Sequence, residues 1–256
     1  MKKIGLVLEG GGGKGAYQIG VWKALRELGI EKYITTVSGT SVGALNAALF
    51  YKGNLAVAEE IWSNITDENV MGLKKRDDYF NGECLFSQET LGNIILDAIR
   101  TSDQSDYCRK CYVTCRYRDK DEVRYFEWSK YYDNELKKRI LLASSAIPVL
   151  FESVNIDGDF YVDGGVKGDN TPIWPLLQYE NLSAIIVVHL GAELLELTQS
   201  IHEKIIEISP SADLGGPVTG TLDFDSTSIS KRMELGYRDA MKCLVPLAEK
   251  LMYENN

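Results

Sequence analysis

The feature that most constrains the fold is a run of glycines between a short apolar segment and a helical pattern. Residues 4–8 are uniformly apolar or glycine, and Gly-Gly-Gly-Gly-Lys-Gly occupies positions 10–15. From residue 16 to residue 28 apolar side chains recur at helical spacing, and Gly29 follows as a stop. Because a helix N-terminus directs backbone amides outward, this strand–turn–helix unit predicts a site for an anion or a developing negative charge.

The same order repeats at once, with a second short strand expected at residues 34–37 and a helix at 42–51. Strands alternating with helices are typical of a parallel sheet covered on its faces. Further helices are expected at 54–65, 87–100, 136–143 and 230–252, two strands within 107–128, a buried strand at 185–190, and irregular connections at 66–86 and 101–107. With no repeat or linker in view, we expect one domain over 1–256, with 66–105 as a candidate lid or insertion.

Charge and composition exclude several classes of protein. The chain has 28 Lys and Arg against 37 Asp and Glu, a net charge of −9. That balance argues against a nucleic-acid partner and against docking on anionic lipid through the overall field. The apolar run at the N-terminus is too short for a signal peptide, and the uncharged stretch 33–51 is too polar for a membrane-spanning helix. We therefore expect a cytoplasmic protein that contacts membranes peripherally, if at all.

Three uses of the glycine run stay open on the residues alone. Gly10, Gly12 and Gly15 fit a dinucleotide fingerprint, but Val-Ser-Gly stands at 37–39, where an acidic residue would hold the ribose. A P-loop fails, because Gly15 replaces the Ser or Thr that would bind magnesium. The other uses are an oxyanion hole made of backbone amides and a tight turn with no ligand.

A candidate nucleophile lies at the second turn. Gly39-Thr40-Ser41-Val42-Gly43 has the G-x-S-x-G pattern between a strand and a helix, the context of a nucleophile elbow. The alternative is that Ser41 is an ordinary helix N-cap.

A serine nucleophile needs a base, and two are available. His189, with Asp163, would give the chain order of a Ser–Asp–His triad, whereas Asp163 in Asp163-Gly164-Gly165 could act alone. His202 lies among polar residues and is expected to be exposed. Cys108, Cys111 and Cys115 lack a fourth ligand nearby, so we expect buried thiols and no metal site.

Taken together, these motifs resemble the patatin-like phospholipases. The glycine run, the serine motif and Asp163-Gly164-Gly165 occur in the order of that family. Ala143-Ser144-Ser145-Ala146-Ile147-Pro148 resembles its A-S-x-A-x-P segment, and Asp169-Asn170-Thr171-Pro172 the continuation of its D-G-G motif. Little can be matched over 66–118, so chain-length and head-group preference stay open.

The resemblance implies a three-layer α/β/α sandwich with a mostly parallel central sheet, and a lipid acyl hydrolase with a Ser41–Asp163 dyad. Ser41 would attack the ester and Asp163 would take its proton. The backbone amides of Gly11, Gly12, Gly13 and Lys14 would hold the oxyanion, supported by Gly10, Gly15, Gly39, Gly43, Gly164 and Gly165. No cofactor or metal is implied. The expected partners are a phospholipid or other acyl lipid and, transiently, a membrane or micelle surface. A Ser–His–Asp esterase, an acyltransferase and a nucleotide-binding module are the alternatives.

Overall fold

The computed structural model describes residues 2–73, 85–101, 106–108, 110–196 and 198–253. The strands are β1 (Ile4–Leu8), β2 (Ile34–Thr40), β3 (Gly72–Leu73), β4 (Phe86–Ser87), β5 (Lys110–Tyr117), β6 (Val123–Glu127), β7 (Val154–Ile156), β8 (Asp159–Asp163), β9 (Ala184–Val188) and β10 (Ile205–Ile208). The helices are α1 (Ala16–Glu27), α2 (Val42–Lys52), α3 (Leu55–Asn64), α4 (Asp67–Val70), α5 (Glu89–Thr101), α6 (Asn134–Ser144), α7 (Trp174–Tyr179), α8 (Gln199–His202) and α9 (Ser226–Tyr253).

The central sheet is mixed but mostly parallel. Its order is β10-β9-β1-β2-β5-β8-β7, and β6 also pairs with β5. Strands β10, β9, β1, β2 and β5 run parallel, whereas β6 and β8 are antiparallel to β5. This is the α/β sandwich expected, with the carboxyl ends of the parallel strands at one edge, where ligand sites of such sheets form.

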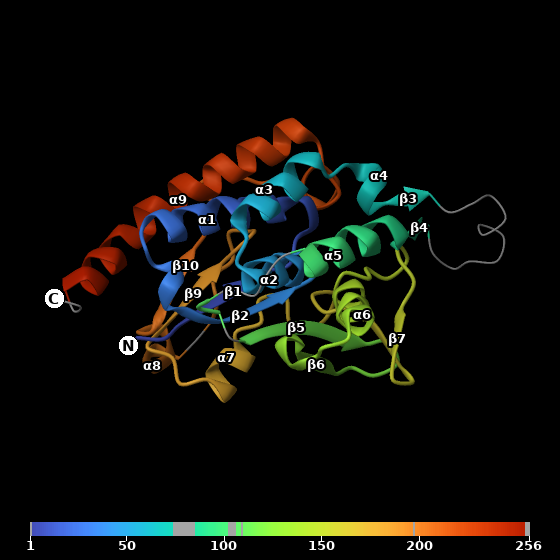
Figure 1. Ribbon diagram of the computed structural model, residues 1–256, viewed down its shortest axis with the longest axis horizontal. Helices are drawn as coiled ribbons and strands as arrows, with labels where there is room; N and C mark the ends of the chain where they lie inside the picture. The colour runs from blue at the N-terminus through green and yellow to red at the C-terminus, as the bar shows by residue number, and fades with distance from the viewer. Residues whose placement is uncertain (1, 74–84, 102–105, 109, 197, 254–256) are drawn as a thin grey trace.

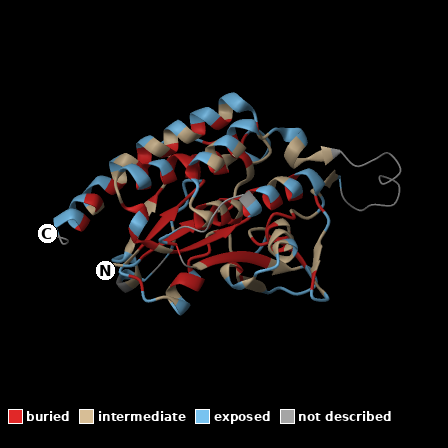
Figure 2. Cartoon of the chain, viewed as in Figure 1, coloured by how far each residue is buried: buried red, intermediate tan, exposed pale blue. Residues whose placement is uncertain are grey.

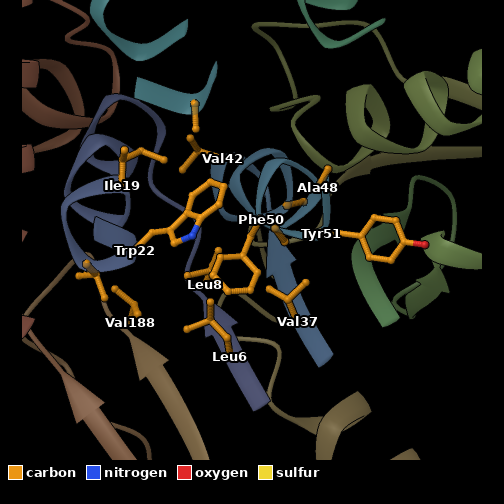
Figure 3. Close-up of a cluster of buried hydrophobic side chains, with 14 of the residues drawn as sticks. Leu6, Leu8, Ile19, Trp22, Val37, Val42, Ala48, Phe50, Tyr51 and Val188 are labelled. Atoms are coloured by element: carbon orange, nitrogen blue, oxygen red, sulfur yellow. The ribbon is translucent and has the colours of Figure 1, made fainter. Parts of the chain in front are cut away.

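Helices cover both faces of the sheet (Figure 1). Buried side chains line the strands and the inner sides of the helices, while exposed residues lie on the outer sides (Figure 2). In β1, Leu6 and Leu8 pack into the larger core, whereas Val7 belongs to a smaller core with Leu176 of α7 on the other face. Figure 3 shows the larger core, where the rings of Trp22 of α1 and Phe50 of α2 pack over the sheet with their centroids 5.0 Å apart. Uniformly apolar strands are what a sheet covered on both faces requires.

The structure also differs from the sequence-based expectations. The sequence predicts irregular structure over 66–86, but the described part of this region contains α4, β3 and β4. The Thr66 side chain caps α4 by accepting a hydrogen bond from the Asn69 amide, a local device that helical periodicity does not reveal. The region 66–105 includes 74–84 and 102–105, which lie outside the described residues.

No helix in the described ranges combines the length and the apolarity needed to cross a membrane. The thiols of Cys108, Cys111 and Cys115 are buried, as expected. Burial raises the pKa of both Cys111 and Cys115.

Candidate active site

Ser41 lies between the last residue of β2 and the first of α2, in a strained backbone conformation. Its φ and ψ are 54° and −126°, a combination that non-glycine residues rarely adopt. It occupies the N-cap position of α2, yet its side chain makes no capping hydrogen bond. The alternative that Ser41 is an ordinary side-chain cap therefore has no support in the structure.

The glycines on either side of Ser41 are required by close backbone contacts. A Cβ added to Gly39 would collide with the carbonyl oxygen of Gly43, and one added to Gly43 would collide with the carbonyl oxygens of Leu8 and Glu9. Even an alanine would therefore push α2 away from β1 and β2. The G-x-S-x-G pattern is the steric condition for this sharp turn.

Strand register brings Asp163 to the same edge of the sheet. Thr40 of β2 pairs with Thr114 of β5, and the next residue of β5, Cys115, pairs with Asp163 at the end of β8. Ser41 and Asp163 therefore lie on opposite sides of β5 at the same level of the sheet. The Ser41 hydroxyl lies near the Asp163 carboxylate, where it acts as a hydrogen-bond donor that lowers the pKa of that carboxyl.

The Asp163 residue is 3% exposed. Burial raises the pKa of its carboxyl group above the ordinary value, although hydrogen bonds from Ser41 and from the amides of Gly165 and Val166 act in the opposite direction. The Gly165 amide donates to Oδ1 at 2.8 Å. A carboxylate with a raised pKa is a better proton acceptor, which suits a general base.

A buried serine from another motif holds the elbow in place. The Oγ of Ser144 accepts a hydrogen bond from the Ser41 amide at 2.9 Å and donates to the Thr114 carbonyl at 2.7 Å. Ser144 thus connects the elbow to β5, beside Asp163. The motif that contains Ser144 is visible in the sequence, but its contact with Ser41 depends on the fold.

The glycine turn forms the neighbouring wall. It is a 3₁₀ turn, Gly12–Gly15, in which the Lys14 amide donates to the Gly11 carbonyl at 3.3 Å. Within the described ranges, no residue accepts a hydrogen bond from the amides of Gly11, Gly12 or Gly13. These three amides are therefore available to an oxyanion, whereas the Lys14 amide is used by the turn itself.

The turn is tied to the loop that follows Asp163. The Gly10 amide donates to the Asn170 carbonyl at 3.1 Å, and Asn170 Nδ2 donates to the Gly10 carbonyl at 3.2 Å. Added Cβ atoms at Gly10 and Gly165 would both collide with the Asn170 side chain. Asn170 is a structural link between the two motifs that spacing alone did not single out.

His189 has other partners. Its side chain is 1% exposed, with Nε2 at 2.7 Å from Glu207 and Nδ1 at 3.6 Å from Glu9. Burial lowers its pKa, but hydrogen bonds and charge from Glu9 and Glu207 outweigh that effect and raise it. Both ring nitrogens thus face carboxylates other than Asp163. His202, as expected, is half-exposed.

An apolar cavity, part of it open to solvent, has Ser41 and Gly12 among its lining residues. One wall is a stripe of α2, and the facing wall is a stripe of α5. Its lining residues include Ser41, then Leu45, Ala48, Leu49 and Lys52 from α2, Leu91, Ile94, Ile95, Ala98 and Ile99 from α5, and Trp62, Met71, Ile147, Phe151, Leu222 and Phe224.

The cavity extends along one face of α2. It follows α2 from Ser41 to Lys52, about 16 Å at about 1.5 Å per residue. One leaflet of a bilayer hydrocarbon core, half of about 30 Å, has nearly the same depth. The described part of 66–105, through Met71 and α5, forms much of the cavity wall.

Within the described ranges, no group of His, Cys, Asp and Glu side chains is placed as metal ligands would be. The fold and the site define an α/β protein with its candidate site at the carboxyl ends of the strands, where a serine and a buried aspartate meet beside a glycine turn. The sequence pattern of the patatin-like phospholipase family matches residues 6–177, more than half of the chain. The chain belongs to this family.

Relatives in other organisms are similar to parts of the chain. Lysophospholipase NTE1 of Cryptococcus neoformans is 25% identical over 205 residues, which cover 75% of this chain and 11% of that protein. Lysophospholipase nte1 of Aspergillus terreus is 53% identical over 49 residues, 19% of this chain and 3% of that protein. The chain thus matches only a small part of these much longer relatives.

Two solved structures share the fold. VipD from Legionella pneumophila superposes with a TM-score of 0.61 at 16% identity, covering 95% of this chain and 66% of that one. Human GIVD cytosolic phospholipase A2, solved in complex with methyl gamma-linolenyl fluorophosphonate, superposes with a TM-score of 0.57 at 10% identity. The match covers 98% of this chain and 58% of that one. At such identities the likeness concerns the fold alone.

Proposed function

We propose that the protein is a serine hydrolase that cleaves acyl esters of lipids, with phospholipids or lysophospholipids as substrates. The observation that carries the proposal is the placement of Ser41, in its strained elbow and lining the apolar cavity, next to the buried Asp163 carboxylate across β5. Family membership and the lysophospholipase relatives support the same chemistry.

The proposed reaction has two halves. Ser41 Oγ attacks the ester carbonyl while Asp163 accepts the hydroxyl proton. The carbonyl oxygen, now negative, is held by the amides of Gly11, Gly12 and Gly13. As the C–O bond to the alcohol breaks, Asp163 returns the proton to the leaving oxygen. In the second half, Asp163 takes a proton from water, the hydroxide attacks the acyl-enzyme, and the fatty acid leaves as Ser41 regains its proton.

The cavity would hold the acyl chain during both halves. Each buried CH₂ group contributes about 0.8 kcal/mol, so longer chains should bind more tightly until the space along α2 is filled. His189 has no part in this scheme, because its Nε2 is 2.7 Å from Glu207 and its Nδ1 faces Glu9 at 3.6 Å, so neither nitrogen is directed at Asp163.

The test is hydrolysis of p-nitrophenyl esters and of a lysophospholipid by purified protein. Ser41→Ala and Asp163→Asn should each lower kcat by at least about 10³-fold, as removal of a nucleophile or its base does. Asp159→Asn is the matched control, since it changes the carboxylate at the other end of β8. Reaction with a fluorophosphonate should label the wild type at Ser41. Retention of activity in the Asp163→Asn variant would refute the dyad, and absence of esterase activity in the wild type would refute the function.

A further inference from the structure

A buried arginine of the C-terminal helix contacts the glycine turn. Arg232 of α9 is 6% exposed. Its Nη1 donates to the carbonyls of Gly13 at 3.2 Å and Asp223 at 2.8 Å. Its Nη2 donates to the carbonyls of Leu214 at 3.3 Å and Thr219 at 3.0 Å, and to the Asp223 carboxylate at 2.7 Å. One planar group thus joins three segments of chain.

The contact with Gly13 restrains one particular peptide group. The carbonyl of the Gly13–Lys14 peptide accepts from Arg232, and the N–H of the same peptide donates to the Gly11 carbonyl. Both polar ends of this peptide are therefore fixed. Because its N–H bonds the Gly11 carbonyl, this peptide also restrains the Gly11–Gly12 peptide, which carries the amide of Gly12 at the centre of the turn.

The segment that Arg232 holds lies directly against the turn. An added Cβ at Gly12 would collide with the Thr221 carbonyl oxygen, and one at Gly13 with the Asp223 carbonyl oxygen. Thr221, Leu222 and Phe224 of this segment also line the cavity. Arg232 therefore clamps the glycine turn and the adjoining cavity wall to each other.

We propose that Arg232 is a positioning residue for the oxyanion hole: by bonding Gly13 and the 214–223 segment together, it fixes the amides that stabilise the transition state. The proposal rests on the proposed esterase function. It assigns a role in the reaction to α9, which lies beyond the matched residues 6–177. Lysine has the charge but not the planar fork, so it could not bond these carbonyls together.

The test compares Arg232→Met and Arg232→Lys with Tyr17→Phe. The control removes another buried contact of α9, the hydrogen bond from Tyr17 to Asp239 at 3.1 Å, which does not touch the glycine turn. Thermal unfolding, kcat and KM for p-nitrophenyl butyrate, and inhibition by an alkyl trifluoromethyl ketone would be measured. The ketone reports on the oxyanion hole because its adduct with a serine carries the same negative oxygen.

We expect Arg232→Met to lower kcat about 10- to 100-fold with KM within about twofold of the wild type, less than removal of an oxyanion donor would cost. The inhibition constant of the ketone should rise by a similar factor, and Arg232→Lys should also lose activity although it keeps the charge. Tyr17→Phe should keep its kcat while losing thermal stability.

The proposal would be overturned if Arg232→Lys had the same kcat as the wild type. It would also be overturned if both Arg232 variants lost no more kcat than Tyr17→Phe does. If Arg232→Met does not fold, the Arg232→Lys result decides. A wild type without esterase activity would instead refute the proposed function.

Discussion

Ser144 offers a sharp test of how the elbow is held. Its Oγ bonds the Ser41 amide and the Thr114 carbonyl, and all three residues are buried. Ser144→Ala leaves both backbone groups without a partner. Each such group costs about 1–3 kcal/mol, so the free energy of unfolding should fall by about 2–6 kcal/mol. For a domain of this size, at about 2–4 °C per kcal/mol, that corresponds to a fall in Tm of about 4–24 °C.

The effect on reactivity should exceed the effect on stability. Without Ser144, the amide that fixes the strained backbone of Ser41 is free to turn, and the hydroxyl loses its alignment with Asp163. The assay is the rate of fluorophosphonate labelling at Ser41, measured well below the Tm together with urea unfolding. Ser38→Ala is the matched control. Ser38 lies in β2, the strand that leads to Ser41, and its hydroxyl donates a buried hydrogen bond of 2.6 Å to the Pro172 carbonyl. Equal labelling rates in Ser144→Ala and Ser38→Ala would refute the reasoning.

Two predictions concern pH. Because the pKa of Asp163 is raised above the ordinary 3.8, kcat/KM should fall on acidification around a midpoint above that value; a midpoint at or below 3.8 would contradict the base assignment. The same shift makes the ionised carboxylate a cost to folding at neutral pH, so Asp163→Asn should be at least as stable as the wild type in urea. His189 has a raised pKa, so its stabilising contribution is complete below 6.5 and is lost as pH rises through the folded-state pKa. His189→Gln, which also leaves Glu9 and Glu207 without the imidazolium, should flatten the pH dependence of unfolding measured across this range. Parallel profiles for variant and wild type would count against the pairing.

The first two strands and helices could be predicted from the sequence because local signals agree there. Short strand patterns at 4–8 and 34–37 are each followed by glycines that allow a sharp turn and then by a helical pattern, and the structure places β1, α1, β2 and α2 at these positions. The candidate nucleophile Ser41 could be singled out on the same grounds. A serine flanked by glycines at a strand-to-helix turn is typical of a nucleophile elbow, and all of these signals lie within ten residues.

The rest of the site depends on contacts between distant residues. The short strand β8 has polar residues at both ends, and its pairing with Cys115 of β5 has no local signal. Arg232 resembles any charged residue of a long amphipathic helix until the fold brings it to Gly13. The helical spacing of α5 is visible in the sequence. Its position facing α2 across the cavity is not, because it depends on the fold.

The backbone strain at Ser41 also separates folding from activity. A non-glycine residue in such a conformation costs about 1–3 kcal/mol, and the surrounding contacts sustain that cost. Replacing the proposed nucleophile with glycine would remove the proposed chemistry and relieve the strain together. Fold stability alone would therefore favour glycine over serine at this position. In this architecture a stable fold therefore does not imply catalytic activity. A descendant with glycine in place of Ser41 is expected to unfold less readily than its parent.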